Sequence, residues 1–285
     1  MTTASTQRIP STSDNIKFKL HCLNRNLFAM SMLKYRDFQG YLVTGQHSGT
    51  HWVKWMLSHA LAHRYDVPPP KFFNNASAAS SDLIGHPKLP RKYPNLPRIA
   101  SSHSIPPYAL GLNILKTPPY ALVVRDVRKV LVSHYEKWKH KYTMPFSEYV
   151  AGDPRGDRYY CDVYWYIRFM NRWGDVAQAL PQKVMVQRYE DFQSDRVAGL
   201  RKISDHFGLA LPEESLQAGA AAGAKEFMSA HHDPAVEPRA LRPDGQGDTA
   251  FTAEDTALLL SILDKHLKHD FGYNFFAQPR GFQGR

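Results

Sequence analysis

The sequence has only two cysteines, Cys22 and Cys161, among its 285 residues. Two thiols cannot form a disulfide framework or a four-cysteine zinc site, so we expect a reducing, cytoplasmic setting. No run of about 18 apolar residues occurs, and we expect no transmembrane helix. The first residues lack the apolar core of a signal peptide. We expect a disordered tail over residues 1–17, followed by a single domain over residues 18–285.

Long basic runs are also missing, although the formal net charge is +10. Lys and Arg are spread among 26 acidic residues, a balance that suits a small polyanionic ligand about as well as a nucleic acid or a solvated basic surface. His59 and His63 stand one helical turn apart, but Ala60 occupies the position where a metalloprotease helix needs glutamate. We therefore expect no metal, and because no long basic run is present we expect no nucleic-acid partner.

What the chain does contain is an alternation of apolar strands and amphipathic helices. The predicted strands lie at 41–44, 98–103, 120–124 and 183–189. The predicted helices lie at 18–38, 53–61, 127–142, 159–180, 194–207, 211–228 and 253–269. This order predicts an α/β fold, a P-loop-like three-layer sandwich in which helices flank a central parallel β-sheet. Residues 66–97 are rich in proline and small residues, and we interpret them as a lid or binding loop.

Polar tips follow the predicted strands at 45–51, 101–104, 125–126 and 189–191. In a parallel sheet these tips meet at the carboxyl edge, where ligands bind. The first tip is a glycine-bracketed loop, Gly45 to Gly49, that runs directly into a helix. Unpaired N–H groups and the positive end of the helix dipole favour a phosphate or sulfate there. The Walker pattern is not met, because the loop is one residue short and no lysine follows Gly49.

The loop resembles that of the cytosolic-type sulfotransferases, in which Lys-Ser-Gly-Thr-Thr-Trp holds the 5′-phosphosulfate of 3′-phosphoadenosine 5′-phosphosulfate (PAPS). Ser48-Gly49-Thr50-His51-Trp52 matches this pattern, and His47 stands where the family has lysine. The resemblance implies donor contacts from His47, Ser48, Gly49, Thr50, His51 and Trp52. Without the resemblance, an ordinary strand-to-helix turn capped by Ser48 or Thr50 remains open.

A second family signature, an arginine at a strand end with a serine eight residues on, matches Arg125 and Ser133. Similarity implies that this pair holds the 3′-phosphate of the donor, which suits a guanidinium that can bind phosphate in a bidentate way. A surface ion pair of Arg125 is the alternative. The segment 184–192 resembles the family's Tyr-Glu-Asp-Met strand end and implies that Tyr189 lies near adenine, unless it and Trp52 are core aromatics. Arg242 matches part of the family's Arg-Lys-Gly segment over the 3′-phosphate.

His103 matches the histidine of the family's Lys-Thr-His segment, which takes the proton from the acceptor hydroxyl. A pKa of roughly 6.5 suits that task. Both lysines that the family places around the transferring group are absent, with His47 and Ser101 in their positions. We expect His47 to act as an imidazolium or as an N–H donor. The other possibilities are that Arg128 reaches the site or that the chain binds donor without turnover.

The resemblance implies a PAPS-dependent sulfotransferase that acts on a hydroxyl or amine of a small-molecule or lipid-like acceptor and releases adenosine 3′,5′-bisphosphate, with His103 and His47 as catalytic residues. The alternative is a catalytically weak or inactive nucleotide-binding module. The sequence does not distinguish a monomer from a homodimer. Aromatic side chains that could line an acceptor site, or be ordinary core, are Tyr108, Phe146, Tyr164, Trp165 and Phe169.

Overall fold

The computed structural model describes Ile16, Leu20 and residues 38–73, 82–85, 92–106, 117–139, 141–142, 144–233, 251–276 and 280–281. The tail predicted over 1–17 and the helix predicted over 18–38 lie almost wholly outside these residues. Tyr108, Arg242 and much of the predicted lid also lie outside them.

A five-stranded, all-parallel sheet forms the centre of the fold, with strand order β2-β3-β1-β4-β5. The strands are β1 (Gly40–Thr44), β2 (Ile84–Gly85), β3 (Ile99–Ser102), β4 (Tyr120–Val124) and β5 (Val184–Arg188). β1 and β4 are buried along their whole length, as their unalternating apolar sequences predict. The parallel sheet predicted from the sequence is confirmed, and the short edge strand β2 is an addition within the predicted lid.

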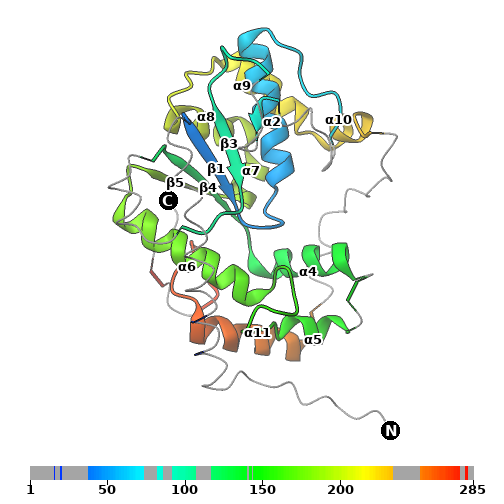
Figure 1. The fold of residues 1–285 in the computed structure, drawn as a ribbon. Coiled ribbons are helices and arrows are strands. Elements are labelled where there is room, and N and C mark those ends of the chain that lie inside the picture. The colour runs from blue at the N-terminus through cyan, green and yellow to red at the C-terminus, as the bar shows by residue number, and fades with distance from the viewer. Residues whose placement is uncertain are drawn as a thin grey trace.

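Helices cover both faces of the sheet, so the fold has the three predicted layers (Figure 1). The helices are α2 (Thr50–Tyr65), α4 (Val127–Trp138), α5 (Phe146–Val150), α6 (Val163–Ala179), α7 (Tyr189–Ser194), α8 (Arg196–His206), α9 (Glu213–Ala222), α10 (Lys225–Ala230) and α11 (Ala253–His266). Alternate residues of β1 face opposite layers: Tyr41 and Val43 pack with α6 and α11, whereas Leu42 packs with α2 and α8. Within the described ranges, no helix is long and apolar enough to cross a membrane.

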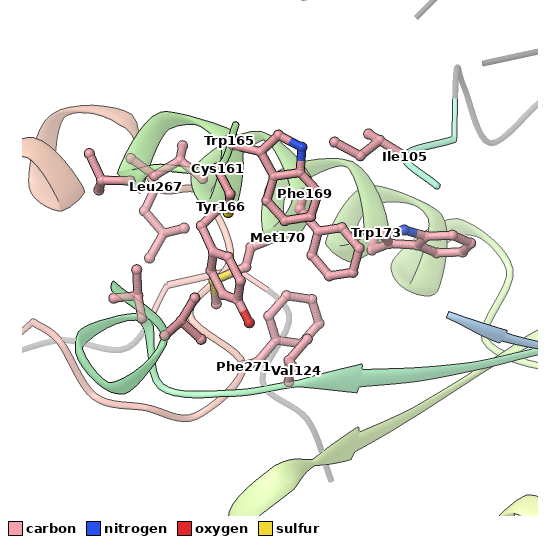
Figure 2. Close-up of a cluster of buried hydrophobic side chains, with 14 of the residues drawn as sticks. Ile105, Val124, Cys161, Trp165, Tyr166, Phe169, Met170, Trp173, Leu267 and Phe271 are labelled. Carbon is pink, nitrogen blue, oxygen red and sulfur yellow. The ribbon is translucent and has the colours of Figure 1, made fainter. Parts of the chain in front are cut away.

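The aromatic side chains of α6 fill the core on one face of the sheet (Figure 2). Tyr164 and Phe169 are almost completely buried, Trp165 is 9% exposed, and only Phe146 on α5 is half-buried. The ring of Trp165 stacks on that of Phe169 at 5.3 Å. Most of the aromatic side chains considered for an acceptor site therefore belong to the core, because other apolar groups already cover them.

Several boundaries, and one short helix, differ from the sequence prediction. β5 ends at Arg188, and Tyr189 opens the short helix α7, whose first turn carries Glu190 and Asp191. Acidic side chains near a helix N-terminus are favourable, which accounts for the early start. The alanine-rich helix predicted over 211–228 divides into α9 and α10 at Gly223, and α5 was not predicted.

Candidate functional site

The carboxyl ends of β3, β1, β4 and β5 lie at one edge of the sheet, because the strand registers end at the same level. Thr44 pairs with Val123, and Val124 pairs with Arg188. Ser102 of β3 pairs with Val43. The predicted site residues that directly follow these strand ends are His47, His103, Arg125 and Tyr189.

The loop after β1 turns into α2 at Gly49, whose φ of +81° lies in the left-handed region. Its first intrahelical hydrogen bond runs from Val53 N to Gly49 O, so the amides of Thr50, His51 and Trp52 precede that bond. No acidic side chain occupies the first turn. The N-terminal end of a helix of this length carries a positive partial charge, so the loop suits an anion.

Arg125 follows β4, the neighbour of β1 in the sheet, and contacts this loop. Its Nη1 donates to the His47 carbonyl oxygen at 2.9 Å, and its guanidinium lies 4.5 Å from the centroid of the Tyr189 ring. The Trp52 ring also contacts Tyr189, with 5.3 Å between the ring centroids. Arg125 Nε is buried and has no hydrogen-bond partner among the described residues. These are contacts of an inward-facing arginine, not of a surface ion pair.

The other loop residues point in different directions. Ser48 is fully buried and its hydroxyl bonds to the Tyr166 hydroxyl, which ties the loop to α6. Thr50 Oγ1 lies 2.5 Å from Thr44 Oγ1 at the end of β1. His51 is exposed on the first turn of α2. The side chain of Ser48 therefore serves to hold the loop, a role that the sequence did not indicate.

His47 is held by two polar neighbours on α4. Its Nδ1 lies 3.3 Å from Ser133 Oγ, and its Nε2 lies 3.1 Å from His134 Nδ1. Burial, followed by the charges of His134 and Lys137, lowers the pKa of His47 to about 2. This environment favours a neutral His47 at pH 7 over the expected imidazolium. The other expected role of His47, that of a neutral N–H donor, agrees with this environment.

His103 lies at the end of β3 beside the loop. Its Nδ1 is 2.8 Å from the Thr44 carbonyl oxygen, which can only accept, so Nδ1 carries the proton and Nε2 carries the lone pair. Burial lowers the pKa of His103, and the hydrogen bond to Thr44 opposes that shift. A neutral imidazole with a fixed tautomer can accept a proton at Nε2.

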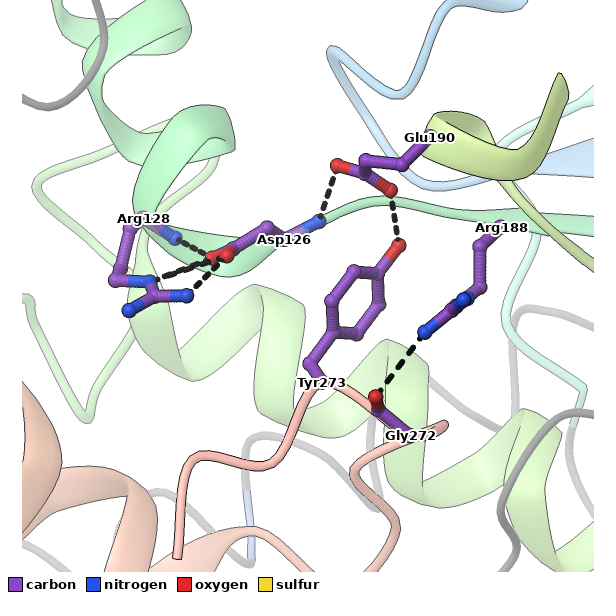
Figure 3. Close-up of polar contacts among 6 residues, drawn as sticks. All are labelled: Asp126, Arg128, Arg188, Glu190, Gly272 and Tyr273. Atoms are coloured by element: carbon purple, nitrogen blue, oxygen red, sulfur yellow. Dashed lines mark hydrogen bonds and ion pairs between the residues drawn. The ribbon is translucent and has the colours of Figure 1, made fainter. Parts of the chain in front are cut away.

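A polar network braces the ends of β4 and β5 against the C-terminal segment (Figure 3). Tyr273 donates to Glu190 Oε2 at 2.6 Å, and Glu190 Oε1 accepts from Asp126 N at 3.4 Å. Asp126 also caps α4 and pairs with Arg128 at 2.5 Å. Arg128, considered as a cation for the site, is therefore engaged at the start of α4. No local pattern indicated Tyr273, because its side chain meets Glu190 only in the folded chain.

Replacing Tyr273 with phenylalanine should weaken this brace. Glu190 loses a hydrogen bond to a charged group, so we expect a loss of about 1–3 kcal/mol in the free energy of unfolding. Urea denaturation measures that loss, and amide exchange should accelerate at Asp126. Tyr135→Phe is the matched control, because it removes the hydroxyl bond to Met144 O (2.9 Å) and leaves Glu190 untouched. Unchanged exchange at Asp126 would contradict the bracing role.

Stability should fall in acid because His47 and His134 are neutral in the folded chain. Burial is the main cause, and the charge of Lys137 adds to it. Together they lower the pKa of His47 to about 2 and that of His134 to about 4, below the usual 6.5. Below pH 6.5 the unfolded chain binds protons that the folded pair does not, so the free energy of unfolding decreases by up to about 1.4 kcal/mol per pH unit for each histidine. Denaturation between pH 7 and 4.5 should give a flatter slope for His134→Phe. Equal slopes for both proteins would exclude this contribution.

The described residues contain no group of three or more His, Cys, Asp or Glu side chains arranged to hold a metal ion. His63, one of the two histidines on α2, bonds instead to Ser215 Oγ at 3.0 Å. Cys161 is a buried free thiol.

Solved structures with a similar fold are sulfotransferases and a dehydratase. A mouse sulfotransferase, SULT7A1, complexed with PAP, has a TM-score of 0.57 at 14% identity, covering 84% of this chain and 88% of its own. Retinol dehydratase in complex with androsterone and the inactive cofactor PAP has a TM-score of 0.53 at 16% identity, covering 82% and 81%. The same protein with retinol and PAP gives 0.51 at 17% identity, covering 80% and 81%. At these identities the likeness concerns the fold.

A comparison with proteins of curated function finds no match. The sulfotransferase domain family model, in contrast, matches residues 39–233, which is more than half of the chain. This range begins just before β1 and includes the loop after β1, His103, Arg125, Ser133 and Tyr189. The chain therefore belongs to the sulfotransferase domain family.

Proposed function

We propose that this protein transfers a sulfuryl group from PAPS to a hydroxyl or amine of a small-molecule or lipid-like acceptor. The observation that carries the proposal is the position of Arg125, which is held between the His47 carbonyl and the Tyr189 ring with a buried, unpartnered Nε. A half-buried cation with spare hydrogen-bonding capacity beside a helix N-terminus fits the two phosphate ends of one nucleotide.

Each end of the donor has a set of candidate residues. The loop around Ser48, with the first-turn amides of α2, would hold the 5′-phosphosulfate, and Arg125 with Ser133 would hold the 3′-phosphate. Trp52 and Tyr189 form an aromatic pair where adenine could stack. Arg242, from outside the described residues, is proposed as a further 3′-phosphate contact. When bound, the donor supplies a sulfuryl group whose bond to the phosphate oxygen breaks as its bond to the acceptor oxygen forms.

His103 is proposed as the general base. Its Nε2 lone pair would take the proton of the acceptor hydroxyl as that oxygen attacks, while Nδ1 keeps its bond to Thr44 O. His47 is proposed to donate its N–H hydrogen bond to the anionic donor on the side of Ser133, where it would stabilise negative charge. Sulfuryl transfer resembles phosphoryl transfer in depending on such stabilisation.

The acceptor class is proposed from two considerations. Retinol dehydratase was crystallised with androsterone and with retinol, both small lipid-like molecules, and it shares this fold. Phe146, among the aromatic residues considered for an acceptor site, is half-buried and packs at the border of the core that α6 fills. A hydroxyl on a small apolar skeleton is therefore the proposed acceptor. The cytoplasmic location stays a prediction from the two cysteines.

Titration with adenosine 3′,5′-bisphosphate tests the donor site. Wild-type protein should bind it, and Arg125→Ala should bind roughly 10- to 100-fold more weakly, because a charge-assisted phosphate contact is lost. The matched control is Arg201→Ala, which removes an exposed arginine that pairs with Glu213 on α9. Absence of binding by the wild type, or equal affinities of all three proteins, would contradict the proposal.

A nucleotide-binding module without turnover is the second candidate. The neutral state of His47, where the family has lysine, favours it because a neutral donor stabilises developing charge less than a cation does. Donor consumption with a panel of phenols, steroid alcohols and amines separates the two: an enzyme releases adenosine 3′,5′-bisphosphate in an acceptor-dependent way, and a module does not.

A further inference from the structure

Four side chains form a continuous hydrogen-bonded chain from the predicted 3′-phosphate position into the protein. Ser133 Oγ lies 3.3 Å from His47 Nδ1, and His47 Nε2 lies 3.1 Å from His134 Nδ1. His134 Nε2 then lies 2.8 Å from the Tyr142 hydroxyl. We refer to these four residues as the histidine relay. Both ring nitrogens of both histidines are thus engaged.

His134, the second histidine of the relay, is held rigidly. His134 is completely buried, and its ring stacks on Tyr149 with a 13° interplanar angle at 5.9 Å. The ring of His47 meets it edge-on, at 87° and 4.9 Å between centroids. Tyr149 is itself fixed by donating its hydroxyl proton to Cys161 O at 2.8 Å. Because the rings cannot turn freely, the ring nitrogen that carries the proton decides whether each histidine presents a donor or a lone pair on a given side.

The direction of the protons follows from the far end of the histidine relay. We assign the Tyr142 hydroxyl, 2.8 Å from His134 Nε2, as the donor of that hydrogen bond, because its one proton then meets the lone pair of the ring nitrogen. His134 then carries its single proton on Nδ1 and donates it to His47 Nε2. His47, also neutral, must carry its proton on Nδ1, on the side of Ser133.

We propose that His134 and Tyr142 are positioning residues that fix the tautomer of His47, so that its Nδ1–H group faces Ser133 and the anion bound there. This inference rests on the proposed function. A lysine offers donors in every direction, but a neutral histidine offers one donor and one lone pair. The opposite tautomer of His47 would turn a lone pair toward the anion and oppose binding. A histidine in the lysine position therefore requires neighbours that hold its proton on one side.

Nitrogen NMR of the full chain with isotope-labelled histidine tests the tautomer directly, because protonated and unprotonated ring nitrogens differ widely in chemical shift. We expect His47 to be protonated at Nδ1 in the wild type. In Tyr142→Phe, His134 Nε2 loses its donor, and His47 should shift toward the Nε2-protonated form. The control Tyr135→Phe removes a neighbouring hydroxyl bond outside the histidine relay and should leave the tautomer unchanged. An Nε2-protonated wild type, or equal tautomers in wild type and Tyr142→Phe, would overturn the inference.

Binding of adenosine 3′,5′-bisphosphate provides the second measurement. We expect His134→Leu to bind roughly tenfold more weakly than wild type, because His47 is no longer held as a donor. His134→Asn, whose amide can replace Nδ1–H, should recover much of that loss. A merely structural role of His134 would give the same loss in both variants and would contradict the inference. If the wild type does not bind the bisphosphate, the proposed function fails, while the tautomer experiment still decides the inference.

Discussion

Replacing His103 with alanine is expected to reduce the turnover number by about 10²- to 10⁴-fold, the usual contribution of a positioned general base. The acceptor hydroxyl would then have no group to take its proton. In the wild type, the hydrogen bond from Nδ1 to the Thr44 carbonyl leaves the lone pair of His103 on Nε2. Single-turnover assays with saturating PAPS and the best acceptor of the panel would measure the effect.

The affinity for adenosine 3′,5′-bisphosphate should stay near its wild-type value in His103→Ala, because the phosphate contacts are proposed for other residues. His63→Ala is the matched control: it removes a histidine at the far end of α2 that bonds to Ser215, and it should retain full turnover. Unchanged turnover in His103→Ala would show that another group removes the proton, and a parallel loss of nucleotide binding would mean that His103 supports the donor site instead.

Replacing Gly49 with alanine is expected to lower the free energy of unfolding by about 2–5 kcal/mol and to abolish measurable nucleotide binding. The left-handed backbone costs a non-glycine residue about 1–2 kcal/mol, and crowding a packed site costs about 1–3 kcal/mol more. An added Cβ would lie 2.6 Å from Tyr189 Cδ2, so the ring must move away from Arg125 and Trp52.

Gly208→Ala separates the two contributions. Gly208 also has a positive φ, +62°, but an added Cβ there has no heavy atom within 4 Å. Gly208→Ala should therefore lose only the stability that the left-handed backbone costs, and it should bind nucleotide normally. Urea denaturation and calorimetric titration of both variants would check this. Equal losses of stability, with binding retained in Gly49→Ala, would mean that the Tyr189 ring is not confined by the loop.

The architecture could be predicted from local patterns. Continuous apolar runs at β1 and β4 indicated strands buried on both faces, and the polar residues after them indicated the edge at which Arg125 and the loop meet. The paired spacing of Arg125 and Ser133 carried more information than either residue alone, because it linked a strand end to the next helix.

The rest depended on contacts between segments that are distant in sequence. The neutral state of His47 comes from burial beside His134, and no local pattern reports that burial. The hydroxyl of Tyr166 is hydrogen-bonded to that of Ser48, and Tyr273, near the C-terminus, donates a hydrogen bond to Glu190. The start of α7 at Tyr189 was missed because the apolar pattern of β5 extends one residue beyond its last pairing with β4.

The strand order has a consequence for engineering the protein. β1 has β3 on one side and β4 on the other, so the proposed base and the proposed 3′-phosphate contacts come from opposite neighbours of a single strand. On the proposed function, residues that follow β3 meet one substrate and residues that follow β4 and β5 meet the other. Acceptor preference could then be redesigned along the β3 border while donor affinity is left alone.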